Sequence, residues 1–116
     1  MKVQVVLDRK GSSRSAQVDQ LISAIIALPK NGKVTVIGAG SDNELDTTAE
    51  AAERMGWNHY GFPRSYDRRG AELLAAVEAL TTMQPDVVLC LPLPDGSRWW
   101  RFITEATRRG FVVVNA

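Results

Sequence analysis

The stretch Asp86-Val87-Val88-Leu89-Cys90-Leu91 decides the fold of this 116-residue chain. Its apolar residues follow one another without the polar alternation of a strand that has one face in solvent, which predicts a strand covered on both faces. Similar short runs lie at Val3–Leu7 and Lys33–Ile37. Between them, apolar residues recur at helical spacing, as in Ser15–Leu28. This alternation predicts a parallel sheet flanked by helices.

Working outward from that stretch, we expect five strands alternating with four helices. The strands are expected at Val3–Leu7, Lys33–Ile37, Asn58–Phe62, Asp86–Leu91 and Phe111–Val114. The helices are expected at Ser15–Leu28, Asp46–Met55, Arg69–Thr82 and Ser97–Arg109. Right-handed crossovers leave few topologies for such a chain. The prediction is a single α/β domain over residues 1–116, with a three-layer, Rossmann-like parallel five-stranded sheet of order 3-2-1-4-5 and helices on both faces.

Composition excludes several classes of protein. The hydrophobic share of 45% and the charged share of 23% are ordinary for a globular domain. No apolar run approaches the ~20 residues of a membrane-spanning helix, and the start of the chain has no signal-peptide pattern. A net charge of +1 argues against a dedicated nucleic-acid binder. The single cysteine, Cys90, predicts a reducing, cytoplasmic setting.

A doubly wound sheet places its ligand outside the carboxyl ends of the strands, where the strand order reverses. For the expected order this position lies beside strands one and four. The loops at that edge are Asp8–Arg14, Gly38–Asn43, Pro63–Arg69 and Pro92–Arg98. Three of them carry Gly next to Ser directly before a helix, where backbone N–H groups favour anions. The same residues are also typical of a plain turn and N-cap, and both interpretations stay open.

The better-known site motifs are missing. In Gly38-Ala39-Gly40 the third glycine of a dinucleotide fingerprint is replaced by Asn43. No Walker loop and no nucleophile elbow occurs, and His59 is the only histidine. No cluster of His, Cys, Asp and Glu has the spacing of metal ligands. We therefore expect neither a metal nor a cofactor, and no triad hydrolase.

Two adjacent tryptophans, Trp99 and Trp100, stand between Arg98 and Arg101 on the last predicted helix. Neighbouring side chains on a helix point about 100° apart, so the two indoles cannot fill one core pocket. We expect one to pack inward and the other to face a ligand or a partner. The outer indole would either stack on a nucleobase or contribute to a dimer interface.

The order of these motifs resembles the SLOG superfamily, and most of all its small branch related to YspA, common in bacteria and phages. Members of that branch carry Gly-Ser-Arg after one strand, Gly-Gly-x-x-Gly-Ala-Asp after the next, Arg-Asn-x-x-Met on a helix, and Pro-Gly-Gly-x-Gly-Thr after a later strand. The corresponding segments here are Asp8-Arg9, Gly38 through Asp46, Arg69-Gly70-Ala71-Glu72-Leu73, and Pro92-Leu93-Pro94-Asp95-Gly96-Ser97. The resemblance spans nearly the whole chain, with the motifs only partly kept.

The resemblance implies a domain that binds nucleotides or nucleotide-derived signals, related to the LOG phosphoribohydrolases and to the DNA-processing protein DprA. The ligand-binding residues that it and the edge geometry together assign are Asp8, Arg9, Gly38, Ala39, Gly40, Asp46, Arg69, Glu72, Pro92, Gly96, Ser97 and Trp100. Trp100 stands where the hydrolase members carry a catalytic Glu, and an indole cannot act as a general acid or base. A sensor or sequestering module is therefore favoured over an enzyme, and no catalytic residue is assigned.

Two other functions remain open at this point. One is a nucleotide N-glycosidase that uses Glu72 or Asp46 as its carboxylate, since an oxocarbenium-like transition state needs one nearby. The other is a protein-interaction module with a vestigial pocket. A homodimer with the last two helices contributing is expected, because the aromatic residues need cover. Arg69, a cation near a helix N-terminus, is expected to face an anionic ligand or a carboxylate.

Overall fold

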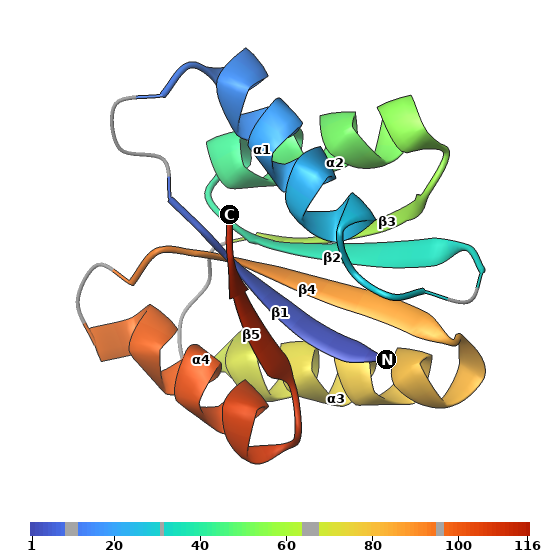
Figure 1. Ribbon diagram of the computed structural model, residues 1–116. Helices are drawn as coiled ribbons and strands as arrows, with labels where there is room; N and C mark the ends of the chain where they lie inside the picture. The colour runs from blue at the N-terminus through green and yellow to red at the C-terminus, as the bar shows by residue number, and fades with distance from the viewer. Residues whose placement is uncertain (9–11, 31, 64–67, 95–96) are drawn as a thin grey trace.

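A computed structural model describes residues 1–8, 12–30, 32–63, 68–94 and 97–116, with residues 68, 69, 97 and 98 described by their backbone only. Within these ranges the expected α/β alternation is confirmed (Figure 1). The strands are β1 Lys2–Leu7, β2 Val34–Gly40, β3 Asn58–Pro63, β4 Asp86–Pro92 and β5 Val112–Asn115. The helices are α1 Arg14–Ile26, α2 Asp42–Met55, α3 Arg68–Met83 and α4 Ser97–Arg108. None of these described helices has the length and apolarity needed to cross a membrane.

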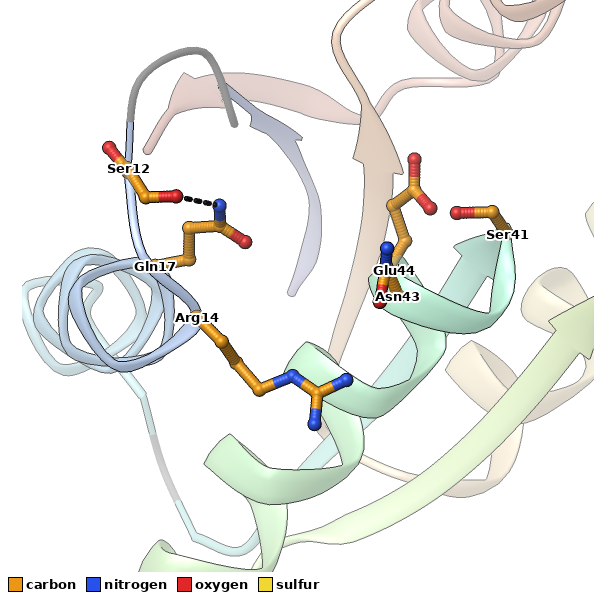
Figure 2. A pocket seen from close by; sticks show the side chains of 6 residues that line it. All are labelled: Ser12, Arg14, Gln17, Ser41, Asn43 and Glu44. Carbon is orange, nitrogen blue, oxygen red and sulfur yellow. Dashed lines mark hydrogen bonds between the residues drawn. The ribbon is translucent and has the colours of Figure 1, made fainter.

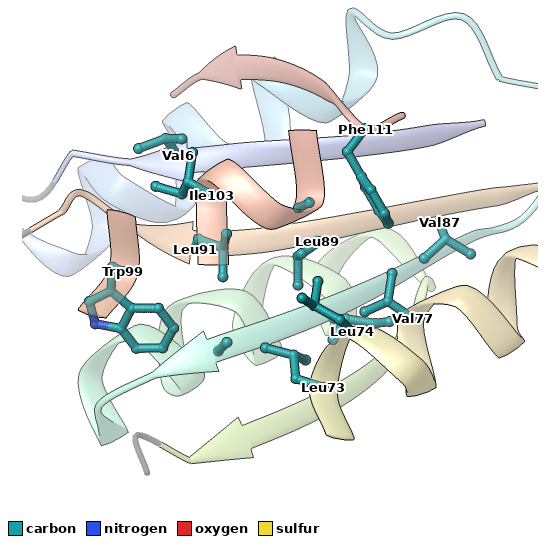
Figure 3. Packing of buried hydrophobic residues seen from close by; sticks show 13 residues of the cluster. Val6, Leu73, Leu74, Val77, Val87, Leu89, Leu91, Trp99, Ile103 and Phe111 are labelled. Carbon is teal, nitrogen blue, oxygen red and sulfur yellow. The ribbon is translucent and has the colours of Figure 1, made fainter. Parts of the chain in front are cut away.

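The parallel sheet is the middle of three layers, with α1 and α2 on one face and α3 and α4 on the other (Figure 1). Each face has its own core. On the first face, Leu21 and Ile25 of α1 pack over Val5 and Val36 of the sheet. Figure 3 shows the second core, whose members are Val6, Ile37, Ala39, Leu73, Leu74, Val77, Val87, Leu89, Leu91, Trp99, Ile103, Ala106 and Phe111. Burial of both faces explains why the strands lack polar alternation.

The strand order differs from the expected 3-2-1-4-5. The order in the structure is β3-β2-β4-β1-β5, so β1 and β4 have exchanged places. β4 pairs with β2 on one side and with β1 on the other, where Leu7 lies opposite Pro92. The expectation that strands one and four are neighbours is confirmed, whereas the expected pairing of strands one and two is wrong.

The rules used for the prediction cannot tell these two orders apart. In both orders the chain moves in one direction across the sheet from β1 to β3 and then in the opposite direction to β5. The crossover connections therefore have the same handedness, and each helix covers the same face of the sheet. The burial of the strands distinguishes the two orders. Every residue of β4 is buried, which fits the central position in the sheet. Strand β1 instead carries the buried Gln4, whose Nε2 donates to Thr107 Oγ1 at 2.6 Å and to the Ile103 carbonyl at 3.3 Å on α4. A buried amide needs such partners, and β1 finds them beneath α4.

Three helices begin earlier than the sequence indicated, and for α3 the difference is the single residue Arg68. Helix α1 is capped by Ser13, whose Oγ accepts from the Ala16 N–H at 3.2 Å, and Ser15 lies inside the helix. Helix α2 begins at Asp42, four residues before the expected start, because strand β2 runs on through Gly40 and leaves Ser41 as the N-cap. The glycines expected in a loop are therefore part of a strand.

As expected, one of the two adjacent tryptophans is buried and the other is exposed. Trp99 is 6% exposed and packs in the core beneath α4, with its ring centroid 5.3 Å from that of Phe102. Trp100 is 59% exposed. The 100° step between neighbouring helical residues thus confirms one inward and one outward indole.

Candidate functional site

A polar cavity of about 390 Å³ lies between the first turns of α1 and α2, at the carboxyl edge of the sheet. It is lined by Ser12, Arg14, Gln17, Ser41, Asn43 and Glu44 (Figure 2). These helices follow β1 and β2, and β4 lies between those two strands. Two strand spacings of about 4.8 Å therefore separate the ends of β1 and β2, which α1 and α2 follow. The exchange of β1 and β4 thus creates room that neighbouring strands would not leave.

The α1 side of the cavity is held by local hydrogen bonds. Gln17 donates from Nε2 to the Ser12 carbonyl at 2.9 Å, which turns its side chain toward the segment before the helix (Figure 2). Arg14 reaches across to α2 and donates from Nη2 to Asp46 Oδ2 at 2.9 Å. Both side chains of this pair are about half exposed, so the pair contributes at most about 1 kcal/mol to stability. Its effect is to place the positive charge of Arg14 beside a carboxylate.

The α2 side of the cavity carries a hydroxyl and a carboxylate. Ser41 has the extended backbone of an N-cap, but its side chain makes no capping hydrogen bond, unlike Ser13 on α1. The Glu44 side chain folds back over the end of β2, where a Cβ on Gly40 would lie 2.9 Å from Glu44 Cβ. Figure 2 shows the Ser41 hydroxyl and the Glu44 carboxylate turned toward each other at this end of the cavity.

A buried contact fixes the first two turns of α2 on the sheet. The Thr48 hydroxyl donates to the carbonyls of Leu45 at 2.9 Å and of Glu44 at 3.2 Å. Its Oγ1 lies 2.9 Å from His59 Nε2 on β3, and since the hydroxyl proton is engaged within the helix, the ring nitrogen is the donor. Thr48 and His59 both lie against Gly38, where the missing side chain leaves space for them. Thr48 and His59 therefore set how close the cavity-lining turn of α2 lies to the sheet.

Burial lowers the pKa of His59 below its ordinary value of 6.5. The unfolded chain therefore binds a proton more readily than the folded chain, so this histidine contributes stability that is complete above pH 6.5 and is lost as the pH falls through 6.5 toward the lowered pKa. We expect the free energy of unfolding in urea to decrease between pH 7.5 and 5.5. His59→Gln should flatten that slope, because no other histidine is present. Equal slopes for the two proteins would contradict the assignment.

The residues predicted from the sequence lie at several places in the fold. Gly40 lies against Glu44, and Asp46 holds Arg14, so both border the cavity. Asp8 follows β1 and is exposed, and Pro92 ends β4 and is buried. Gly38 contacts Thr48 of α2, whereas Ala39 belongs to the core on the α3 and α4 side.

The remaining predicted residues are on the other side of the sheet or outside the description. Glu72 on α3 and Trp100 on α4 are exposed and lie across the sheet from the cavity. Arg9 and Gly96 lie outside the described residues. Arg69 and Ser97 are in the first turns of α3 and α4, but their side chains lie outside the description.

Sequence reasoning assigned no ligand role to the six described residues that line the cavity. A signal for half of them is present in Ser41-Asp42-Asn43-Glu44, the Ser-x-x-Glu pattern of a capping box, which predicts a helix starting at Asp42. With that start, Ser41, Asn43 and Glu44 belong to one first turn that faces the neighbouring helix.

No family model, curated protein or solved structure matches this chain. Among the residues that the structure describes, no three His, Cys, Asp or Glu side chains gather closely enough to hold a metal ion. The described lining residues of the cavity carry hydroxyl, amide, carboxylate and guanidinium groups.

Proposed function

We propose that this protein binds a nucleotide or a nucleotide-derived small molecule, as a sensor or sequestering module, in the cavity between α1 and α2. The observation that carries the proposal is the cavity itself: about 390 Å³, lined among the described residues by six polar side chains, at the carboxyl edge of a parallel sheet. Small-molecule sites commonly measure ~300–1,000 Å³ and lie at such edges beside a topological switch point. Here the helices after β1 and β2 cover one face, and the helix after β4 covers the other.

The resemblance to SLOG-like domains supports the same class of ligand, because such domains bind nucleotides or their derivatives. Binding is favoured over cleavage of the N-glycosidic bond. By the resemblance, Trp100 would correspond to the hydrolases' Glu, and Glu72 on α3 lies across the sheet from the cavity. Asp46 is engaged by Arg14.

A thermal-shift screen with ribonucleoside monophosphates tests this proposal. At 100 times its dissociation constant, a ligand adds about 2.7 kcal/mol to the stability of the folded state. For a domain of this size we expect Tm to rise by roughly 10 °C. Incubation of the same mixtures, followed by chromatography, should show intact nucleotide. Released base would favour the glycosidase instead, and a panel that leaves Tm unchanged would count against nucleotide binding.

We also propose that the protein works in a reducing, cytoplasmic setting, and the resemblance to SLOG-like domains favours a bacterial or phage origin. Support comes from Cys90, the single cysteine of the chain, which is fully buried in β4. Burial raises the pKa of Cys90 to about 12, so the thiol is protonated and unreactive.

We further propose that two copies of the chain associate. The support is apolar surface on α4 and on the edge strand β5, where Trp100, Val112 and Val113 are 59%, 63% and 43% exposed. Light scattering at tens of micromolar should give twice the 12.7 kDa of the chain, and Trp100→Ser should shift the mass toward the monomer. Ile26→Ser, at a 48% exposed residue at the end of α1, serves as the control and should leave the mass unchanged. A wild-type mass of one chain would contradict the dimer.

A further inference from the structure

The outer edge of β5 presents backbone hydrogen-bonding groups where the described sheet ends. Among the described strands, β5 is the last in the sheet order and pairs with β1. The Ala116 N–H donates to the Val6 carbonyl at 3.0 Å, so every second residue counted back from Ala116 faces β1. The backbone groups of the residues between them are directed to the other side of the strand. The N–H and C=O groups of Val113 and Asn115 therefore point outward from the sheet.

The residues of β5 do not protect this edge. Edge strands commonly carry a charge or a proline that prevents pairing with another chain. The opposite edge strand, β3, contains Gly61 and ends in Pro63, where glycine weakens a strand and proline lacks a donor. The segment Val112–Ala116 carries no charge, no glycine and no proline, and both Val112 and Val113 are exposed. An extended chain therefore fits the edge of β5 better than the edge of β3.

We propose that the β5 strands of two copies pair antiparallel across a two-fold axis, so that the two sheets join into one. This inference rests on the proposed association of two copies and specifies its geometry. A pair centred on Val114 sets Val113 opposite the partner's Asn115, and these two residues exchange N–H···O bonds. The axis repeats the exchange, so the edge of β5 is complementary to itself. This register engages both outward-facing residues of the strand.

The surface of α4 supports the same geometry. Phe102 lies against Gly70 of α3, and Trp100 stands two residues earlier, about 200° around the helix from Phe102. Trp100 therefore lies on the side of α4 that faces away from α3. Helix α4 contacts β1 through the partners of Gln4, and β5 is the next strand beyond β1. Joining the two sheets sets a second α4 beside this side of the helix, where it covers the exposed indole.

Cysteine cross-linking tests the register of the pair. In a pair centred on Val114, the two Val114 Cα atoms lie about 4.5 Å apart, which suits a disulfide. Under mild oxidation, Val114→Cys should therefore give a linked pair of chains on a non-reducing gel. Val112→Cys is the matched control, on the same face of β5 and more exposed. The two Val112 Cα atoms would lie roughly 13 Å apart along the strands, too far to be linked. The native Cys90 is fully buried and does not interfere.

A proline substitution tests the backbone hydrogen bonds. Val113→Pro removes an N–H that points outward and leaves the hydrogen bonds to β1 in place. It should weaken association about tenfold or more in light scattering, while circular dichroism keeps the wild-type spectrum. Val113→Thr keeps both the N–H and the β-branched shape, so it should associate like the wild-type protein.

The outcomes separate this pairing from the proposed association itself. If the wild-type protein is a dimer but Val114→Cys is not linked, or is linked no better than Val112→Cys, the pairing is refuted and the dimer stands. The same holds if a folded Val113→Pro associates as strongly as the wild-type protein. A wild-type mass of one chain refutes the dimer and this pairing together. If Val113→Pro does not fold, the two cysteine variants decide between these outcomes.

Discussion

Replacing Gly70 with alanine should destabilise the protein by about 1–3 kcal/mol and lower its Tm by roughly 4–12 °C. Helix α3 crosses α4 at this glycine, and a Cβ there would lie 1.7 Å from Cε1 and 2.2 Å from Cζ of the Phe102 ring. The ring would have to leave its place beside Trp99, giving up part of the core. Alanine is the better helix former by about 1 kcal/mol, so a fall in stability would show that the crossing outweighs helix propensity. Urea unfolding followed by tryptophan fluorescence measures the effect.

A double-mutant cycle tests whether the clash with Phe102 is the cause. Phe102→Leu alone should cost stability through lost burial, but Gly70→Ala should cost much less in the Phe102→Leu background. The interaction energy between the two changes should reach about 1 kcal/mol or more. Strict additivity would show that Gly70 matters for some reason other than its contact with this ring.

The second large effect is expected for Gly38→Ala, which should loosen α2 from the sheet. A Cβ on Gly38 would lie 2.2 Å from Thr48 Oγ1 and 3.1 Å from His59 Nε2, so the hydrogen bond between those two residues cannot stay in place. We expect a loss of about 1–3 kcal/mol in the free energy of unfolding. Because the turn that contains Glu44 moves with α2, nucleotide binding should weaken in the same variant.

Gly61→Ala is the matched control for Gly38→Ala. Gly61 lies opposite Gly38 in the neighbouring strand, and a Cβ there would meet Leu45 at 3.4 Å and His59 at 3.6 Å, which are ordinary contact distances. We expect its stability and nucleotide binding to stay close to those of the wild-type protein. An equal loss in both variants would mean that the sheet tolerates no side chain at either position, and the role given to Thr48 would be wrong.

The sequence was sufficient for the fold class because the strands and helices carry different periods of apolar residues. An uninterrupted run such as Val87–Leu91 differs clearly from the helical spacing of Val18, Leu21 and Ile25. The caps were not settled by the sequence, since both Ser13 and Ser15 suit an N-cap chemically, whereas in the structure Ser13 has the extended backbone and the capping hydrogen bond.

The order of the strands and the position of the site were beyond the rules applied to the sequence. The rules for crossover connections are satisfied equally by both positions of β1 in the sheet. The choice between the two strand orders therefore depends on contacts such as those of Gln4 with its hydrogen-bond partners on α4. The site is linked to that choice, because Arg14 and Glu44 line one cavity from the helices that follow β1 and β2, and β4 lies between those two strands. When two helices follow strands that a third strand separates, no pattern in the sequence shows that residues of the two helices lie close together.

The strand order also determines when the protein can fold during synthesis. Among the described strands, only β2 and β3 are neighbours both in the chain and in the sheet. The earliest-synthesised of the described strands, β1, pairs through Val3 with Val88 on one side and with Val112 on the other. Contacts between such distant segments require large loops to close first, and they slow folding. A nascent chain that ends before Asp86 therefore contains a β2–β3 pair but no partner for its own N-terminal strand.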